Sequence, residues 1–228
     1  MGNEDRPLQA QTDWPMPIEG MERLYPQRLP AEQAKEALLQ IGRRLYEKGY
    51  AAANDGNISY LLAPGRVLAT PTGVSKGFMT TSMLVVVDSE CRVLEGDWLP
   101  STELLLHLRV YQENPEARAV IHAHSPIATA FACAGIPLDR PILAEALNLL
   151  GQVPVAPYAA PGTQELAASV VPYLQTYAGV LLANHGVLTW GASLTEAMYR
   201  LERIEHYAKL MLLTGHLPQP AISLAVDL

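Results

Sequence analysis

The sequence has few cysteines, a deficit of basic residues and no long apolar run, and each of these shortages excludes a class of protein. Its 228 residues include two cysteines, Cys91 and Cys133, too few for a disulfide-stapled secreted fold, so a reducing, cytoplasmic location is expected. Sixteen basic against 23 acidic side chains give a net charge of −7, which offers no basic surface to nucleic acid or an anionic membrane. No apolar run reaches the about 18 residues of a membrane span, and the polar N-terminal segment lacks the apolar core of a signal peptide. Small solutes and other protein chains remain as the expected partners.

Length and hydrophobic content predict one compact domain with a large core. Hydrophobic residues make up 49% of the chain and charged residues 17%, and 228 residues divided by about 150 residues per domain give roughly one and a half. Helix-like and strand-like patterns alternate over residues 31–215 without a repeat or a linker, which predicts a single three-layer α/β/α domain with a mixed central β-sheet. Residues 1–30 carry five prolines and are predicted to form an extended arm, and residues 216–228 a C-terminal tail.

Hydrophobic spacing predicts which segments are helical and which are extended. Apolar residues that recur every three or four positions predict helices at 31–48, 101–114, 125–135, 163–177 and 193–215. Short β-branched or apolar runs between turn residues predict strands at 59–63, 66–70, 83–88, 119–124, 153–158 and 179–190, the last interrupted by a turn at 184–186. Pro172 is expected to kink or split its helix, and Ser193 with Glu196 to form a capping box. The order of the strands in the sheet is not readable from these patterns.

Three histidines are the first candidates for chemistry. His122 and His124 lie two apart in the predicted strand AVIHAH, so their side chains share a face and could bind one divalent ion. His185 lies in LLANHGVLTW, at a turn that follows a buried strand. Three neutral imidazoles leave one coordination position of zinc open, which is the catalytic arrangement. The ordinary alternative is one solvated histidine, one histidine bonded in the core and one turn histidine without a function.

A carboxylate and several small turns are the next candidates. Glu103 in PSTELLLH is predicted in the first turn of a helix, where the helix dipole favours negative charge, and taken alone it is an ordinary capping residue. Ser101 and Thr102 add hydroxyls and backbone amides at the same helix start, which predicts an anion site that could hold a phosphate. Further small, amide-presenting turns occur at Gly56, Asn57 and at Thr72, Gly73. Lys76 follows the last of these and is predicted to be a solvated lysine.

The order of these motifs resembles the class II aldolase and adducin family. DGNIS, TPTGVSKG, PSTE, HAHS and ANHGV precede a long C-terminal helix, and the resemblance spans about residues 31–215. Within the family the chain is most similar to the zinc-dependent L-fuculose-phosphate aldolase type. The resemblance implies an α/β/α subunit, one Zn²⁺ per subunit, a sugar-phosphate substrate and a homotetramer with active sites between neighbours. The site residues that it implies are His122, His124 and His185 as zinc ligands, Glu103 as catalytic acid/base and further ligand, and Gly56, Asn57, Thr72, Gly73, Ser101 and Thr102 for the phosphate.

The reaction implied by the resemblance is the reversible cleavage of a ketose 1-phosphate to dihydroxyacetone phosphate and an aldehyde. Glu103 would remove and return the C3 proton, with its pKa raised toward neutrality once substrate displaces it from the metal in a partly closed cleft. A pentulose-phosphate 4-epimerase is an alternative, although the resemblance would then lead to Asp at position 103. A methylthioribulose-1-phosphate dehydratase is a further one. The presence of the three histidines and Glu103 argues against a non-catalytic adducin-like binding module.

The chain departs from the fuculose-type aldolases in its tyrosines. The resemblance leads to one tyrosine after the HxH strand and one in the C-terminal tail, which act on the oxygen of the departing aldehyde. Neither SPIATAFACAGIPLDRPIL nor HLPQPAISLAVDL contains a tyrosine. The acid for the aldehyde oxygen is therefore unassigned and the identity of the aldehyde is open, with His206 and Tyr207 as weak candidates for that acid.

Overall fold

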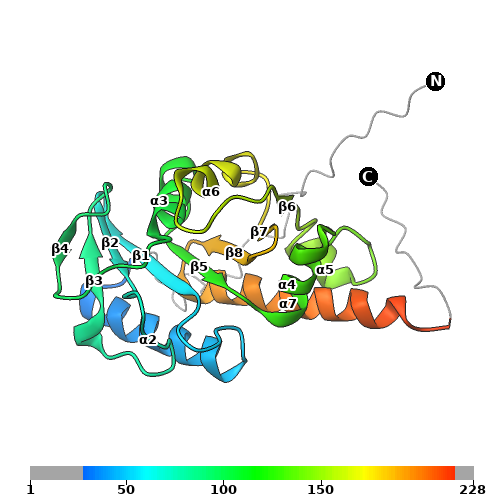
Figure 1. Cartoon of the computed structure of the whole chain (residues 1–228), viewed down its shortest axis with the longest axis horizontal. Helices are drawn as coiled ribbons and strands as arrows, with labels where there is room; N and C mark the ends of the chain where they lie inside the picture. The colour runs from blue at the N-terminus through cyan, green and yellow to red at the C-terminus, as the bar shows by residue number, and fades with distance from the viewer. Residues whose placement is uncertain (1–27, 219–228) are drawn as a thin grey trace, which may run out of the picture.

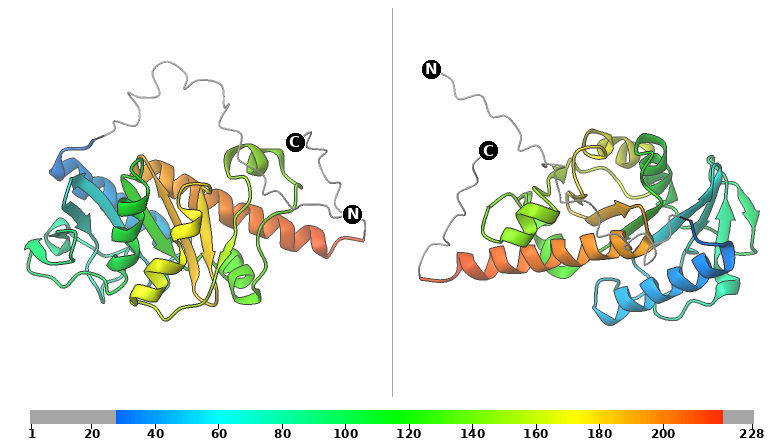
Figure 2. Two further views of the ribbon diagram at one scale, coloured as in Figure 1. Left: turned by 90° about the horizontal axis from the view of Figure 1, so that it is seen from above. Right: turned by 180° about the vertical axis from the view of Figure 1, so that it is seen from behind.

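The described part of the chain is a mixed β-sheet covered by helices on both faces. The computed structural model describes residues 28–218, so most of the predicted arm and most of the predicted tail lie outside the described residues. Helices lie above and below the sheet in Figure 1, and the long last helix runs along one of its faces in both views of Figure 2. This arrangement confirms the predicted α/β/α class with a mixed sheet.

Eight strands form the sheet in the order β4-β3-β2-β1-β5-β8-β7-β6. The strands are β1 (Asn57–Ala63), β2 (Arg66–Ala69), β3 (Val85–Val87), β4 (Val93–Glu95), β5 (Ala119–Ala123), β6 (Val155–Ala156), β7 (Gly179–Leu182) and β8 (Gly186–Gly191). Neighbouring strands are antiparallel except for β6 and β7, which are parallel. The strand β5 that carries the HxH motif lies between β1 and β8, so its residues are placed by hydrogen bonds on both sides.

The helices divide between the two faces of the sheet. The helical elements are α2 (Ala31–Glu47), η1 (Thr81–Met83), α3 (Leu104–Glu113), α4 (Pro126–Ala134), α5 (Ala144–Leu149), α6 (Gln164–Ser169), η2 (Val171–Tyr173) and α7 (Leu194–Gly215). The α7 helix contacts both α2 and α4, and these three helices lie on one face of the sheet, while α3 and α6 pack on the other. Both faces of the central strands are therefore covered, whereas the edge strand β4 is exposed.

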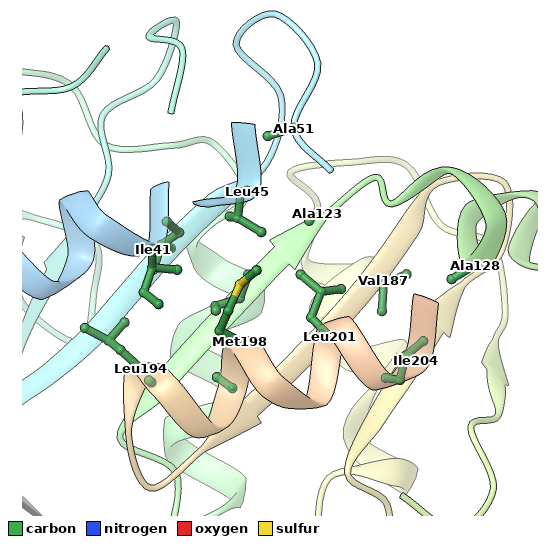
Figure 3. Close-up of a cluster of buried hydrophobic side chains, with 14 of the residues drawn as sticks. Ile41, Leu45, Ala51, Ala123, Ala128, Val187, Leu194, Met198, Leu201 and Ile204 are labelled. Carbon is green, nitrogen blue, oxygen red and sulfur yellow. The ribbon is translucent and has the colours of Figure 1, made fainter. Parts of the chain in front are cut away.

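The larger core lies between the sheet and α7. In Figure 3 the apolar stripe of α7, including Met198, Leu201 and Ile204, points at Val187 of β8 and Ala123 of β5. A second apolar cluster, around Trp190, fills the space between the sheet and α3 and α6. Both cores pack against the strands next to the histidines, and this packing fixes the positions of the strand ends.

Several predicted boundaries change for local reasons. The helix predicted from Ser101 begins at Leu104, because Thr102 and Glu103 form a turn in which the Ser101 hydroxyl accepts a hydrogen bond from the Glu103 N–H. Pro172 splits its helix into α6 and η2. The strand predicted at 153–158 shrinks to β6, since a proline on each side cannot donate to a ladder. The short β4 and α5 were not predicted.

Glu205 is a buried carboxylate that joins α7 to α4. Its Oε1 accepts a hydrogen bond from the Ile127 N–H at 3.0 Å and its Oε2 one from the Ala128 N–H at 2.8 Å. These are orphan donors at the start of α4, where Ser125 makes no side-chain capping bond. A negative charge is favourable at a helix N-terminus. Glu205 thus fixes the helix that begins directly after the HxH segment.

Glu205→Ala is expected to lower the free energy of unfolding by about 2–3 kcal/mol, because it removes an ionic acceptor from two N–H groups in the interior. Urea denaturation followed by circular dichroism measures this loss. The matched control is Glu36→Ala, which removes an exposed glutamate from α2 and is expected to change stability by less than about 0.5 kcal/mol. Equal stability of the two variants would show that the cap contributes nothing.

A search for membrane spans gives a negative result for residues 28–218: none of their helices combines the length and the apolar character needed to cross a bilayer.

Candidate metal centre and active site

The three predicted histidines meet at the end of β5. Their ligand nitrogens all lie within 4.8 Å of one another. His122 Nε2 and His124 Nε2 are 3.1 Å apart, so the pair faces one side of the strand as predicted. His185 comes from the turn between β7 and β8, and its ring centre lies 4.5 Å from that of His122. Three imidazoles at this separation could hold one divalent ion.

Hydrogen bonds orient two of the imidazoles toward this centre. His122 Nδ1 lies 3.0 Å from the Val187 carbonyl oxygen, which can only accept, so Nδ1 carries the proton and Nε2 presents its lone pair. His124 Nδ1 lies 3.3 Å from the carboxylate of Asp55, which likewise leaves Nε2 for the centre. Burial lowers the pKa of His122 to about 4, which keeps this ring neutral. A neutral, oriented imidazole is the form that binds a metal ion.

Glu103, at the N-cap of α3, completes the centre. Its Oε1 lies 3.0 Å from His185 Nε2 and its Oε2 3.5 Å from His122 Nε2, and Asn57 Nδ2 donates to Oε2 at 2.8 Å. Burial raises the pKa of this carboxyl, but the adjacent His185 and His122 and the bond from Asn57 outweigh it and hold the pKa well below its usual range. The rise of the Glu103 pKa toward neutrality is predicted for the carboxylate displaced from the metal by substrate, and it stays a prediction.

Four buried side-chain atoms at the site make no hydrogen bond of standard geometry to the described residues. They are Asn57 Oδ1, Glu103 Oε1, His107 Nε2 and His185 Nδ1, of which Glu103 Oε1 still contacts His185 Nε2 at 3.0 Å. Unsatisfied polar atoms are costly in an interior, so their occurrence beside three convergent imidazoles fits a site built for a cation. The residues present therefore suit a divalent metal ion with nitrogen ligands and one carboxylate.

The backbone around His185 depends on two small or permissive residues. Asn184 has a φ of 55°, a left-handed conformation that asparagine tolerates better than most residues. At Gly186 an added Cβ would lie 2.7 Å from His124 Cδ2 and 3.1 Å from His122 Cε1. The third histidine can therefore approach the other two only because glycine follows it.

Gly186→Ala is expected to weaken zinc binding at least tenfold, since the new methyl group displaces the rings of His122 and His124. Competition with a chromophoric zinc chelator measures the affinity, and circular dichroism reports whether the variant is folded. The control is Gly215→Ala at the end of α7, where nothing lies within 4 Å of the added Cβ. Wild-type zinc affinity in a folded Gly186→Ala variant would argue against this metal centre.

The three turns predicted to bind phosphate lie together at one end of the inner strands. An isolated β-bridge pairs Pro71 with Pro100, and the Thr72 N–H donates to the Leu99 carbonyl at 2.9 Å, which brings the second turn to the third. The bond from Asn57 to Glu103 joins the first turn to the third. Figure 1 shows the start of α3 beside β1 and β5. The predicted residues Gly56, Asn57, Thr72, Gly73, Ser101 and Thr102 thus lie around one side of the metal centre.

Lys76 is buried, and the prediction that it is solvated is wrong. Its exposed fraction is 2%. Its Nζ donates to the Asn54 carbonyl at 2.9 Å and to the Val74 carbonyl at 2.7 Å. Burial lowers its pKa to about 8, although the charges of Asp55 and Glu103 oppose this shift. The lysine belongs to the interior of the site because these carbonyls replace its water.

Two further groups at the site were given no role from the sequence. Asp55, which orients His124, lies in the DGNIS motif next to the predicted phosphate turn. His107, fully buried on α3, faces Ser59, whose hydroxyl lies 2.7 Å from His107 Nδ1 and 2.7 Å from the Tyr111 hydroxyl. Burial lowers the pKa of His107 to about 3, so it is neutral. In the sequence, only the position of His107 one helical turn after Glu103 could have indicated a role for it. His206, by contrast, is exposed on α7.

Comparisons with known proteins show the family of this chain. Residues 36–212 match the model of the class II aldolase and adducin N-terminal domain. A 3-oxo-tetronate 4-phosphate decarboxylase of Haemophilus influenzae is 39% identical over 77% of this chain and 85% of its own. An L-fuculose phosphate aldolase of Methanococcus maripaludis is 32% identical over 78% of this chain and 96% of its own. The crystal structure of YgbL from Klebsiella pneumoniae, described as a putative aldolase/epimerase/decarboxylase, superposes with a TM-score of 0.80 at 36% identity and covers 87% of this chain and 97% of that one.

These relatives are enzymes that cleave carbon–carbon bonds, and lyase chemistry suits both named activities. The matched residues include every histidine of the metal centre, Glu103 and the three turns. The chain therefore belongs to the class II aldolase and adducin family, and it is a lyase.

Proposed function

We propose that this chain is a metal-dependent decarboxylase that converts a phosphorylated 3-oxo sugar acid, 3-oxo-tetronate 4-phosphate or a close analogue, to dihydroxyacetone phosphate and CO2. The observation that carries the proposal is the centre of three histidines with Glu103 as its single carboxylate, combined with the lack of tyrosine after the HxH strand and in the C-terminal tail. Relatives named as such decarboxylases, at 39% and 36% identity, support the choice of substrate.

The chemistry explains why missing tyrosines favour decarboxylation. In an aldol cleavage the hydroxyl proton of the departing aldehyde has to be removed by a protein group. In a 3-oxo acid the carboxylate leaves as CO2 without any proton transfer, and the electron pair of the broken bond passes to the neighbouring ketone as an enediolate. Both reactions can yield the same enediolate of dihydroxyacetone phosphate. A site with one acid/base group is therefore complete for decarboxylation.

Each residue of the centre has a role in this proposal. His122, His124 and His185 would hold the metal, proposed as one Zn²⁺ per subunit because three neutral imidazoles suit zinc. When bound, such an ion would supply Lewis-acid polarisation of the substrate ketone. Glu103 delivers one proton, taken from solvent, to the carbon that loses CO2. Asn57 holds the carboxylate of Glu103 in place through its bond to Oε2.

The phosphate of the substrate would bind at the three turns. Backbone N–H groups of these turns other than that of Thr72, the hydroxyls of Thr72, Ser101 and Thr102, and the start of α3 would make a neutral anion site beside the metal centre. Binding of the phosphate at these turns would place the ketone of the substrate, rather than its phosphate, at the histidines. The residues proposed to bind it are Gly56, Asn57, Thr72, Gly73, Ser101 and Thr102.

A zinc-dependent aldolase that cleaves an L-fuculose 1-phosphate-like ketose is the second candidate. The observation in its favour is the 32% identity to a protein named L-fuculose phosphate aldolase, together with glutamate rather than aspartate at position 103. The epimerase and the dehydratase remain alternatives that share the metal centre.

A substrate panel tests the proposal. The zinc-loaded protein is given 3-oxo-tetronate 4-phosphate, L-fuculose 1-phosphate, a pentulose 5-phosphate and methylthioribulose 1-phosphate, with protein-free samples to correct for the spontaneous CO2 loss of 3-oxo acids. We expect kcat/KM for CO2 release to exceed that for aldehyde release at least tenfold. Faster aldehyde release would identify the aldolase instead, and a product that is only epimerised or dehydrated would identify one of the other two.

The proposed active form is a cytoplasmic homotetramer with active sites at subunit interfaces. Large apolar side chains stand exposed on the single subunit, among them Phe78 and Leu99, with exposed fractions of 68% and 73%. Both flank turns of the proposed phosphate site, so a neighbouring subunit that covers them would close this site. Sizing of the native protein against roughly four times the subunit mass of 24.8 kDa tests the tetramer.

A further inference from the structure

Lys76 is a buried cation whose backbone is clamped onto a helix. Its exposed fraction is 2%, and an ammonium group in such a place needs fixed partners because it has lost its water. An added Cβ at Gly42 of α2 would lie 2.7 Å from the Lys76 carbonyl oxygen, and one at Gly77 would lie 2.6 Å from the ring of Tyr46. The segment that carries Lys76 therefore rests directly on α2, which gives its side chain a fixed origin.

The ammonium group joins two loops of the proposed phosphate site. The Val74 carbonyl, 2.7 Å from Nζ, belongs to the turn that follows Thr72 and Gly73. The Asn54 carbonyl, 2.9 Å from Nζ, belongs to the loop that leads into Gly56 and Asn57. One cation thus joins the two turns at the end of the β1–β2 ladder, where the Thr70 hydroxyl also accepts a hydrogen bond from the Ile58 N–H at 3.2 Å. Charge-assisted bonds of this kind are among the stronger hydrogen bonds in proteins.

The loop that Lys76 holds also reaches the metal centre. Asp55 follows Asn54 and contacts His124 Nδ1, and Asn57 donates to Glu103. At Gly56 an added Cβ would lie 2.9 Å from the His122 carbonyl oxygen, so the backbone of the loop packs on the HxH strand. A shift of this loop would therefore move both the turn proposed to bind the phosphate and the contacts that the loop makes with the metal ligands.

We propose that Lys76 is a positioning residue for the substrate phosphate, because its ammonium group ties the Thr72–Gly73 turn to the Gly56–Asn57 turn and supplies positive charge behind both. The inference rests on the proposed function, in which these turns bind phosphate. The turns themselves offer only neutral donors, and the chain as a whole carries a net charge of −7. A buried cation is therefore a source of attraction for a dianion that the remaining charge does not supply. Through Asp55 the same tie links phosphate binding to metal binding.

The test compares Lys76→Met with Lys209→Met. Methionine keeps much of the buried stem of Lys76 but neither its charge nor its two hydrogen bonds, while Lys209 is exposed on α7 and its replacement changes the net charge equally. Calorimetric titration with inorganic phosphate measures affinity without any turnover. We expect the phosphate Kd of Lys76→Met to rise at least tenfold and that of Lys209→Met to stay within about twofold of wild type. With a phosphorylated substrate the loss should appear in KM more than in kcat.

The predicted link between the two sites has a second readout. In the wild-type protein, inorganic phosphate should tighten zinc binding, and zinc should tighten phosphate binding by the same factor, since such coupling is reciprocal. In Lys76→Met the factor should fall to about one. A structural role without coupling would weaken both affinities but leave the factor unchanged.

Hydrogen exchange on the unaltered protein covers the case in which Lys76→Met does not fold. Phosphate should slow amide exchange in residues 54–57 and 72–76 together, and protection of only one of these segments would overturn the inference. If wild type binds phosphate and folded Lys76→Met binds it equally well, the role of Lys76 is wrong while the proposed function stands. If wild type binds neither inorganic phosphate nor a phosphorylated substrate, the phosphate site of the proposed function itself is wrong.

Discussion

Replacement of Glu103 by glutamine is expected to lower turnover at least a hundredfold while zinc stays bound. Glutamine keeps the shape of the side chain, and its amide oxygen can still accept the hydrogen bond from Asn57, but it cannot carry a transferable proton. Positioned proton transfer contributes about 10²–10⁴-fold to rates. The direct readout is the exchange of the hydroxymethyl protons of dihydroxyacetone phosphate with D2O, followed by NMR.

The matched control for this variant is Glu113→Gln at the far end of α3. Glu113 forms an ion pair with Arg109 at 3.1 Å on the same helix, away from the histidines. Its replacement should leave exchange and turnover within about twofold of wild type. Normal proton exchange in Glu103→Gln, with zinc bound, would mean that another group moves the proton.

Removal of the metal is expected to reduce activity about a thousandfold or more. Polarisation of the reacting carbonyl by a metal ion is worth several kcal/mol, and each 1.36 kcal/mol is a factor of ten in rate. Dialysis against a chelator should abolish turnover and added Zn²⁺ should restore it. His185→Ala should bind zinc more weakly and should not recover wild-type turnover when zinc is in excess, because only two imidazoles remain.

His206→Ala is the control for His185→Ala, since His206 is exposed on α7 and contributes nothing to the centre. Its zinc content and turnover should match those of wild type. Full activity in the chelated protein, or an anomalous metal peak away from the three histidines, would contradict the assignment of the centre.

The convergence of the three histidines could be predicted because local patterns decide where each of them lies in its strand or turn. His122 and His124 are two residues apart, so their side chains lie on the same face once the segment forms a strand. The segment forms a strand because it pairs with β1 and β8 and is buried between the two cores. The start of a helix predicted the place of Glu103, but its role came only from the family resemblance, because alone it is an ordinary capping residue. His185 needed a turn between two strands, which the Asn-His-Gly sequence signals.

The remaining features depend on long-range contacts that no local pattern records. Lys76 was expected in solvent because lysine usually is, yet two carbonyls from separate loops replace its water. Asp55 acquires its role only when its loop folds against His124. The strand order places β1, rather than a later strand, beside β5, and the short exposed β4 has no apolar pattern to reveal it. These are properties of the assembled sheet.

The distinction between decarboxylation and aldol cleavage rests on a single proton. Both leave an enediolate next to a phosphate-bearing carbon, so the metal centre, Glu103 and the phosphate turns serve either reaction. Only the aldolase needs a further group at the oxygen of the departing aldehyde. Introduction of a tyrosine at the site is therefore not expected to improve CO2 release.

The most direct test follows both the carbon and the proton in one sample. The zinc-loaded protein is incubated in D2O with 3-oxo-tetronate 4-phosphate that carries carbon-13 in its carboxylate, and the products are read by NMR. We expect labelled CO2 and bicarbonate together with dihydroxyacetone phosphate that carries one deuterium in a single stereochemical position. Label release no faster than in the chelated sample, or deuterium spread equally over both positions, would contradict decarboxylation at this centre.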